Sequence, residues 1–281
     1  MTDVTAPAAD LAIGVDVGGS GIKVGVVDVA GGELVTPRLR VKTPEPSSPT
    51  AIIPAIVRTV ARAVKQTSDV PPDAPVGIGV PSVVVDGVTR SAANIDQAWI
   101  EFDAGRALGA ALKRPILVLN DADAAGLAEM RFGAGVGERG VVFVLTLGTG
   151  VGSALFNDGV LVPNTELGHM EIRGRDAERR SAAAARTRRG LSWKAWASDL
   201  DEHLNAIDKL FSPNLIILGG GVSKQPEKFI PRLTIRPRVV PAKLRNDAGI
   251  VGASAAIAHG TQSPRLARRR PRAHGDPLVP G

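Results

Sequence analysis

The strongest constraint on the fold is a pattern that occurs twice along the chain. An apolar strand over residues 11–17 leads into the turn Gly18-Gly19-Ser20-Gly21, and a further pair of strand segments over 22–41 completes a three-stranded meander. The second copy spans 140–163 and carries Gly148-Thr149-Gly150 at its own first turn. Each copy is followed by alternating helical and strand segments. This duplication predicts an α/β fold of two similar domains with a ligand cleft between them.

The alternation after each meander sets the predicted domain limits. Apolar spacing predicts helices at 50–65, 103–112, 122–132, 191–210 and 249–259 and strands at 76–80, 116–119 and 215–218. We expect an N-terminal domain over 11–120 and a C-terminal domain over 121–260, with Gly133, Gly135 and Gly137 as a plausible hinge. Residues 1–10 are predicted to be disordered, as is the basic tail 261–281, where arginines lie among prolines and glycines.

Composition narrows the classes of function. The 281 residues include no cysteine, which excludes disulfides, thiolate zinc sites and cysteine nucleophiles and fits a reducing compartment, so we expect the cytoplasm. The N-terminus lacks a basic segment ahead of an apolar one, and no apolar run is long enough for a membrane span. Much of the net charge of +6 lies in the tail, which we interpret as a solvated extension rather than an arm that binds polyanions.

Both glycine turns have the composition of phosphate-binding loops. Glycine is required where backbone N–H groups approach phosphate oxygens with no side chain between them. A single turn of this kind is as consistent with an ordinary hairpin as with a phosphate-binding loop. Two such turns at matching places in a duplicated architecture favour a phosphate donor site. Asp16, at the end of the first strand, could hold Mg²⁺ through water. The predicted donor-site residues in these segments are Asp16, Gly18, Gly19, Ser20, Gly21, Lys23, Thr146, Gly148, Thr149 and Gly150.

A carboxylate at another strand end is the candidate general base. Asn120 and Asp121 directly follow the apolar strand 116–119, and open α/β sheets place ligands at such ends. Asp121 can accept the proton of an attacking hydroxyl, and Asn120 can bond a neighbouring hydroxyl. The structural alternative makes Asp121 the N-cap of the following helix. Asp123 is the weaker candidate for the base.

Glu166 and His169, three residues apart, and Glu178 further on supply groups suited to sugar hydroxyls. Carboxylates accept hydrogen bonds from hydroxyls, and histidine can donate or accept. A metal site would need a third close ligand, and none is evident nearby.

Together these motifs resemble the ROK family of sugar kinases, within the actin-like ATPase (ribonuclease H-like) fold, from residue 11 to about 260. Within the family the chain looks most like the polyphosphate-using glucokinases and a related glucomannokinase. The matching segments are 16–23, Asn120-Asp121, 146–153, Glu166-x-x-His169 and Gly219-Gly220-Gly221.

The resemblance implies roles for single residues. Asp121 is the expected base, and the expected sugar ligands are Asn94, Asn120, Asp121, Glu166, His169 and Glu178. Gly220 and Gly221 match the adenosine side of the donor site. The family's cysteine-rich zinc loop is absent between His169 and Glu178, so no zinc is expected, and the segment 170–178 resembles the polyphosphate-using branch.

Basic residues give that branch some physical support. If 176–189 is one helix, the helical period places four arginines within about a quarter turn of one another, namely Arg175, Arg179, Arg186 and Arg189. More positive charge lies near the first meander, at Lys23, Arg38, Arg40 and Lys42. These side chains could hold a polyanionic donor in a positive groove. The alternative is a solvated helix face with some salt bridges.

The sequence therefore predicts a kinase that transfers a phosphoryl group from polyphosphate, and from ATP, to the 6-hydroxyl of glucose, with mannose as a further acceptor and with Mg²⁺. A strictly ATP-dependent hexokinase for mannose, fructose or an N-acetylhexosamine is the alternative within the class, and a non-catalytic sugar sensor is the alternative outside it. We expect no nucleic-acid or membrane partner. The oligomeric state stays open, although homodimers are usual in families of this kind.

Overall fold

The computed structural model describes residues 11–261. The predictions of disorder for residues 1–10 and for the basic tail, apart from residue 261, therefore lie outside the described residues.

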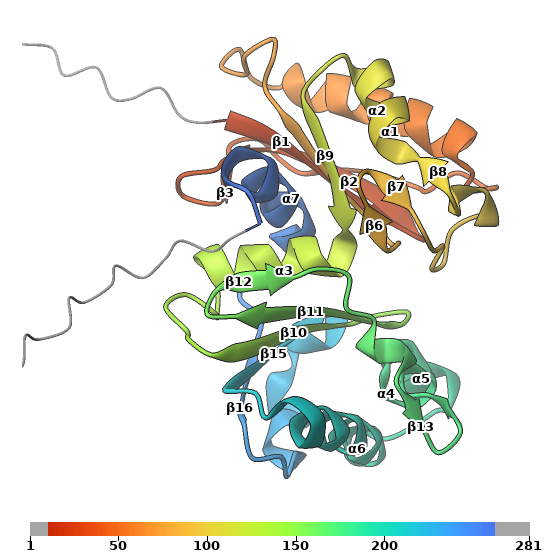
Figure 1. Ribbon diagram of the computed structural model, residues 1–281, viewed down its shortest axis with the longest axis vertical. Coiled ribbons are helices and arrows are strands. Elements are labelled where there is room, and N and C mark those ends of the chain that lie inside the picture. Colours follow the sequence, from red (N-terminus) through yellow and green to blue (C-terminus); the bar gives the residue numbers. More distant parts are fainter. Residues whose placement is uncertain (1–10, 262–281) are drawn as a thin grey trace, which may run out of the picture.

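The first meander opens a mixed sheet in the order β3-β2-β1-β5-β9, with β4 also paired to β2. Strands β1 and β2 are antiparallel, whereas β1, β5 and β9 run parallel (Figure 1). The predicted strand over 33–41 is divided into two short strands, because Pro37 between them has no N–H to donate. The bounds are β1 Leu11–Gly18, β2 Gly21–Asp28, β3 Glu33–Leu34, β4 Leu39–Val41, β5 Val76–Val80 and β9 Ile116–Asn120.

The second sheet repeats this topology, with the order β12-β11-β10-β15-β16. Here β10 and β11 are antiparallel, and β10, β15 and β16 run parallel. The antiparallel hairpin and the two parallel neighbours occur in the same order in both sheets, so the predicted structural duplication is present. The bounds are β10 Val141–Leu147, β11 Val151–Asn157, β12 Val160–Val162, β15 Leu215–Gly220 and β16 Arg238–Pro241.

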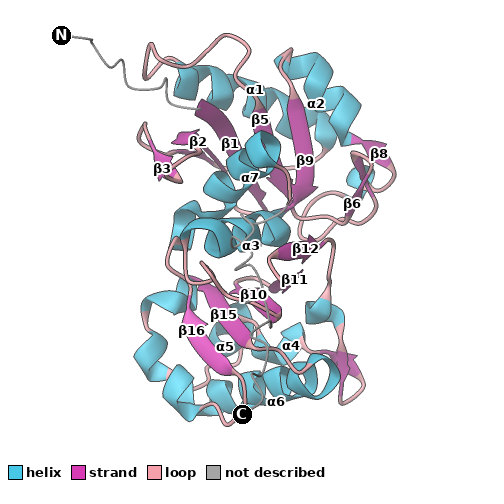
Figure 2. Cartoon of the chain, turned by 60° about the vertical axis from the view of Figure 1, so that its left-hand side comes forward, coloured by secondary structure: helices cyan, strands magenta, loops and turns pink. Residues whose placement is uncertain are grey.

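Two helices lie between the sheets, α3 (Asp121–Phe132) and α7 (Ala248–His259) (Figure 2). Small residues let α7 pack very close to its neighbours. A Cβ at Gly77 of β5 would lie 1.8 Å from the carbonyl oxygen of Ala253, and one at Gly252 would lie 1.6 Å from that of Ala124. The closing helix thus packs against the first sheet, although its residues fall in the predicted domain 121–260. The division at residue 121 stays a prediction.

The remaining helices cover the outer faces. Helices α1 and α2 pack on the first sheet, and α6 packs on the second, where Trp196, Phe143 and Phe229 form an aromatic part of the core. Their bounds are α1 Pro49–Val64, α2 Ala104–Leu112, α4 Glu178–Ser181, α5 Ala183–Arg188 and α6 Trp193–Phe211. Within residues 11–261, no helix is both long and apolar enough to cross a membrane.

Short elements complete the chain. The minor strands are β6 Val84–Val85, β7 Val88–Thr89, β8 Phe102–Asp103, β13 Glu171–Ile172 and β14 Arg175–Asp176. Short 3₁₀ helices lie at Gln97–Trp99, Leu167–His169, Gly221–Lys224, Pro226–Lys228, Ile230–Arg232 and Arg245–Asp247.

The segment 176–189 is not one helix, so the hypothesis of a single basic helical stripe is wrong. Asp176 belongs to β14, and Ala182, with ψ of 150°, separates α4 from α5. Tertiary packing stabilises this break: the Nε1–H group of Trp196 in α6 lies 3.1 Å from each of the backbone carbonyl oxygens of Ser181 and Ala182, to which it donates.

Candidate active site

A cleft of about 500 Å³ lies where the glycine turns of both sheets meet the junction of β9 and α3. It brings together residues that are far apart in the sequence. Of the predicted site residues, only Gly21 is not among those that line it. The predicted residues that do line it are Asp16, Gly18, Gly19, Ser20, Lys23, Asn94, Asn120, Asp121, Thr146, Gly148, Thr149, Gly150, Glu166, His169, Glu178, Gly220 and Gly221.

Asp121 is the first residue of α3, directly after the carboxyl end of β9. The alternative that Asp121 caps this helix is wrong, because Asn120 is the N-cap. The extended backbone of Asn120 lets its Oδ1 accept hydrogen bonds from the backbone N–H groups of Ala122 at 2.8 Å and Asp123 at 3.1 Å. The carboxylate of Asp121 is therefore not needed for capping and lies in the cleft.

The environment of Asp121 disfavours its charged form. Burial raises the pKa of Asp121 from 3.8 to about 7, and the negative charges of Asp16, Glu166 and Asp123 act in the same direction, against the backbone N–H of Ala122. A carboxylate that titrates near neutral pH matches the requirement for a general base at physiological pH. Perturbed carboxyls of this kind cluster at functional sites.

Asp123 lies in different surroundings from Asp121, although burial also raises the pKa of Asp123 to about 7. Its Oδ2 accepts a hydrogen bond from the backbone N–H of Asn164 at 2.8 Å, and its side chain is not among the groups that line the cleft. The side chain of Asn164 in turn bonds both the N–H and the carbonyl of Val84, each at 2.9 Å. Asp123 therefore supports a connection between α3, the loop after β12 and the small sheet.

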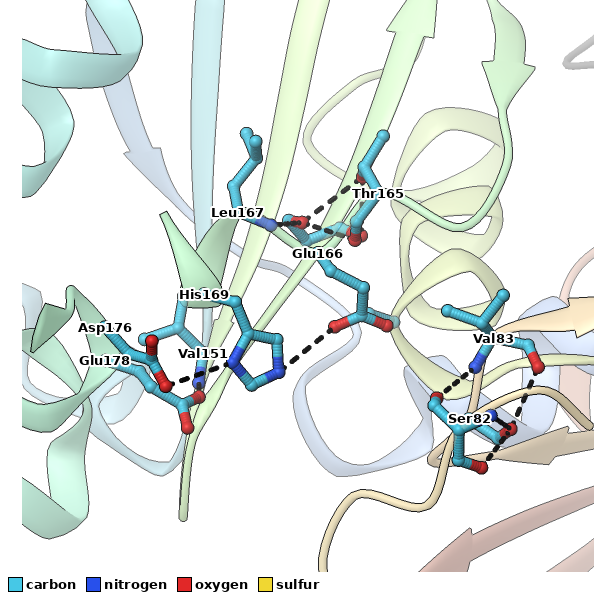
Figure 3. A network of polar contacts seen from close by, with 12 residues as sticks. Ser82, Val83, Val151, Thr165, Glu166, Leu167, His169, Asp176 and Glu178 are labelled. Atoms are coloured by element: carbon cyan, nitrogen blue, oxygen red, sulfur yellow. Dashed lines mark hydrogen bonds and ion pairs between the residues drawn. The ribbon is translucent and has the colours of Figure 1, made fainter. Parts of the chain in front are cut away.

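Figure 3 shows three of the predicted sugar-binding residues, Glu166, His169 and Glu178, all of which line the cleft. The Nε2 atom of His169 lies 4.0 Å from the Oε2 of Glu166, and its Nδ1 atom lies 3.4 Å from the Oδ2 of Asp176. Glu178 Oε2 accepts a hydrogen bond from the backbone N–H of Val151 at 2.9 Å. Burial raises the pKa of Glu166, with the positive charge of His169 opposing it.

Asn120 contacts both Glu166 and Ser82, and Ser82 lies just after β5 of the first sheet. The Nδ2 atom of Asn120 donates to the carbonyl of Ser82 at 3.1 Å and to Glu166 Oε1 at 3.4 Å. Because its Oδ1 caps α3, all of these contacts together fix the orientation of the amide. The exposed side chain of Asn94 lies on the wall formed by the first sheet, and a Cβ at Gly19 would lie 2.9 Å from the carbonyl oxygen of Asn94.

The prediction missed His203, a buried residue of α6 that lies behind the loop carrying His169. Its Nε2 donates to the carbonyl of Leu167 at 3.0 Å, and its Nδ1 lies 2.9 Å from Ser181 Oγ. Burial lowers the pKa of His203, which favours the neutral ring. His203 thus ties the loop that carries His169 to the helix that begins at Glu178. The sequence feature that could have identified His203 is its position on the apolar face of the helix predicted over 191–210.

The predicted donor end of the cleft is formed by backbone and by a charged pair. Asp16 and Lys23 face each other across the β1-β2 hairpin, and their side chains form an ion pair at 2.6 Å. A Cβ at Gly148 would meet no atom within 4 Å, so its turn leaves open space in the cleft. Gly220, by contrast, has φ of 83°, and a Cβ there would lie 2.1 Å from the carbonyl oxygen of Leu147.

The start of α7 also lines this end, which the prediction did not include. The residues involved are Arg245, Asn246, Ala248 and Gly249. A helix N-terminus favours anions, since its first N–H groups have no partner within the helix. The prediction of a helix that begins at Gly249 therefore already indicated a place where an anion could bind.

The chemistry of this end suits a divalent cation held together with phosphates. Asp16 offers a carboxylate that is only partly exposed beside the glycine turns, and Mg²⁺ is typically bound by one or two carboxylates plus substrate phosphates and water. In the part of the chain that the structure describes, no group of three His, Cys, Asp or Glu side chains could hold a metal by itself.

Comparison with known proteins yields matches over most of the chain. A profile of the ROK family matches residues 12–190. The polyphosphate glucokinase of Mycobacterium tuberculosis is 45% identical over 244 residues, which cover 86% of this chain and 89% of that protein.

Solved structures agree with these sequence matches. The inorganic polyphosphate/ATP-glucomannokinase of Arthrobacter sp. strain KM superposes with a TM-score of 0.85 at 48% identity, covering 88% of this chain and 98% of that one. A ROK family glucokinase from Streptomyces griseus, in complex with glucose and AMPPNP, superposes with a TM-score of 0.71 at 26% identity over 87% and 98%.

Proposed function

The chain belongs to the ROK family, and from this premise we propose that it is a hexose kinase that transfers a phosphoryl group from inorganic polyphosphate, and from ATP, to the 6-hydroxyl of glucose. The predicted family and the actin-like ATPase fold are confirmed by these relatives. The identity of 45% to a polyphosphate glucokinase extends over most of both chains, which supports the same reaction here.

One observation carries the proposal: the carboxylate of Asp121 lies in the same cleft as both glycine turns. A kinase needs a base beside the acceptor hydroxyl and a phosphate-binding surface facing it. The elevated pKa of Asp121, about 7, makes it a base of suitable strength, because a proton acceptor works best when its pKa lies near the operating pH.

In the proposed reaction, sugar hydroxyls are bound by Glu166, His169 and Glu178 together with Asn94 and Asn120. The 6-hydroxyl oxygen attacks the terminal phosphorus of the donor, and its proton passes to the carboxylate of Asp121. A new O–P bond forms as the bridging P–O bond breaks, and the bridging oxygen leaves on the shortened donor. Backbone N–H groups of both glycine turns stabilise the charge that develops on the transferred group.

Asp16 would hold Mg²⁺ through water, and the ion would supply charge neutralisation to the donor phosphates. Zinc is not part of the proposal, because the chain contains no cysteine. Mannose is proposed as a second acceptor, since the solved relative from Arthrobacter is a glucomannokinase.

The decisive experiment is a matrix of donors and acceptors. Purified protein is assayed with long-chain polyphosphate or ATP against glucose, mannose, fructose and N-acetylmannosamine, and sugar phosphate is quantified directly. Glucose phosphorylation by both donors is the expected result. Turnover with ATP alone would support a strictly ATP-dependent hexokinase.

A second measurement separates the enzyme from a sugar sensor. Isothermal titration that shows glucose binding, with no turnover by either donor, would favour the non-catalytic alternative. Location in the cytoplasm and assembly as a homodimer stay predictions, the latter to be tested by sedimentation of the purified protein.

A further inference from the structure

A second cavity, of about 610 Å³, is lined by five arginines and lies beside the cleft. We call it the arginine pocket. Its residues come from β14, from α4 and from the end of α5, namely Arg175, Arg179, Arg180, Arg188 and Arg189. The proposed reaction does not use any of these side chains. The break at Ala182 is what brings the two short helices around this space.

The arginine pocket has more positive charge than the carboxylates around it can neutralise. Asp199 accepts hydrogen bonds from both Arg180 and Arg189, and Glu202 pairs with Arg180 while also bonding Arg173. Within residues 11–261, no carboxylate forms an ion pair with the three other arginines of the pocket, which are Arg175, Arg179 and Arg188. Guanidinium groups stay charged in proteins, so the surplus is available to an anion.

The guanidinium groups are held in place by neighbouring elements. Asp199 of α6 has a side chain that is only 8% exposed, and it fixes Arg180 and Arg189 at the base of the pocket. Arg188 Nη2 donates to the backbone carbonyl of Arg179 at 3.0 Å, which connects the end of α5 to α4. Such anchoring lowers the entropy lost when a ligand binds.

The arginine pocket and the cleft share a wall. Glu178 lines the cleft, and the next residue, Arg179, lines the pocket. The backbone N–H of Ala184, in α5, donates to the carbonyl of Gly148 at 3.0 Å, so the helix that ends at the pocket is bonded to the second glycine turn. The arginine pocket is therefore connected to the second glycine turn through α5.

We infer that the arginine pocket binds the distal phosphates of a linear polyphosphate whose terminal phosphate lies in the cleft. The inference rests on the proposed function. Planar guanidiniums suit phosphate oxygens, which they can bind with two parallel hydrogen bonds. The phosphate chain of a nucleoside triphosphate ends after three phosphates, whereas a long polyphosphate continues and can extend from the cleft into the pocket. The pocket therefore favours long polyphosphate over ATP and over tripolyphosphate.

The test is a double variant, Arg175→Ala with Arg179→Ala, compared with Arg58→Ala and Arg62→Ala. The control pair lies on the exposed face of α1, has the same change in net charge, and has no ion pair within the described residues. The Michaelis constant KM is measured for long-chain polyphosphate, tripolyphosphate and ATP with glucose saturating. We expect the pocket variant to raise KM for long chains at least about tenfold more than KM for ATP, a factor that corresponds to about 1.4 kcal/mol.

Salt dependence gives an independent readout. Each phosphate contact contributes about 0.7 to the slope of log affinity against log salt for flexible single-stranded nucleic acids, so losing two contacts should lower the slope for long polyphosphate by roughly 1 or more. The control variant should retain the wild-type slope. The pocket side chains tested are exposed, so thermal unfolding should be unchanged.

The outcomes are distinguishable. Equal increases in KM for all donors, or equal effects in the pocket and control variants, would overturn the distal site and leave the kinase assignment intact. A wild-type protein that uses ATP but no polyphosphate of any length would overturn the proposed donor, and the distal site with it.

Discussion

Replacing Asp121 by Asn should remove turnover and, at neutral pH, make the protein more stable. The change keeps the size of the side chain but removes both its charge and its ability to accept a proton. Loss of general-base catalysis typically lowers turnover by a factor on the order of 10² or more. The gain in stability has a separate cause, since a pKa that differs between the folded and unfolded states makes stability depend on pH.

The sign follows from the direction of the shift. The pKa of Asp121 is about 7 in the folded protein and 3.8 as its ordinary value, so the folded state holds this proton more tightly. No difference exists well below pH 4, where both states are protonated. Stability is then lost as pH rises toward 7, because the unfolded chain gains by ionising while the folded one does not. The loss is complete above about pH 7.

The pKa shift sets an upper limit on the change in the free energy of unfolding. A shift of about 3 pKa units corresponds to about 4 kcal/mol at 1.36 kcal/mol per unit, which is an upper limit. Asp121 is only half-buried and lines an open cleft, so water screening reduces this to about 1–2 kcal/mol. For a chain of this size, that amounts to roughly 2–8 °C in Tm.

The assay compares Tm for wild type and Asp121→Asn between pH 4 and pH 8, with Asp73→Asn as the control at an exposed carboxylate. The difference for Asp121→Asn should grow from near zero to its full value across this range, and that for Asp73→Asn should stay near zero. Turnover of wild type should rise over the same range as Asp121 ionises. A difference in Tm that is the same at pH 4 and pH 8, or turnover within tenfold of wild type, would refute the assignment of Asp121.

Three further substitutions test other parts of the site. Gly148→Val should raise KM for the donor at least about tenfold more than KM for glucose, because the open space at Gly148 belongs to the donor end; a change confined to glucose affinity would contradict this. His203→Ala should raise KM for glucose more than KM for the donor, since His203 bonds the loop that carries His169; an equal rise in both would show a general structural role. Asn120→Ala should destabilise the protein by about 1 kcal/mol through loss of the helix cap, measured by denaturant unfolding, and no loss would remove Asn120 as the cap.

Much of the fold could be predicted from local signals. Glycine turns between apolar strands are short-range features, and their repetition predicted two sheets that share one topology. Packing over long range could not be predicted in the same way. Helix α7 is buried on almost all sides by small residues, so its sequence has no polar face to show that it lies between the sheets against β5. The break at Ala182 likewise depends on another element, because Trp196 of α6 bonds the carbonyls of Ser181 and Ala182.

In the candidate site, too, some features could be predicted from local sequence and others depend on long-range packing. Residues on strand ends and glycine turns were predictable, because topology places such ends in one crevice. The separation of roles between Asp121 and Asp123 was not. Both carboxylates lie in the first turn of α3, and they are distinguished only by what each meets, the open cleft for Asp121 and the N–H of Asn164 for Asp123.

The positive groups of the donor end have a consequence beyond donor affinity. Asp16 is the largest electrostatic contribution to the raised pKa of Asp121, and Lys23 lies 2.6 Å from Asp16. A bound polyanion adds further negative charge beside Asp121, which raises the pKa of the base and favours its protonated, inactive form. Lys23 and Arg245 also line this cleft, and their positive charges would partly neutralise the donor phosphates. A donor site that pairs its phosphates with these cations therefore adds less net negative charge beside Asp121 than a site built from glycine turns alone would add.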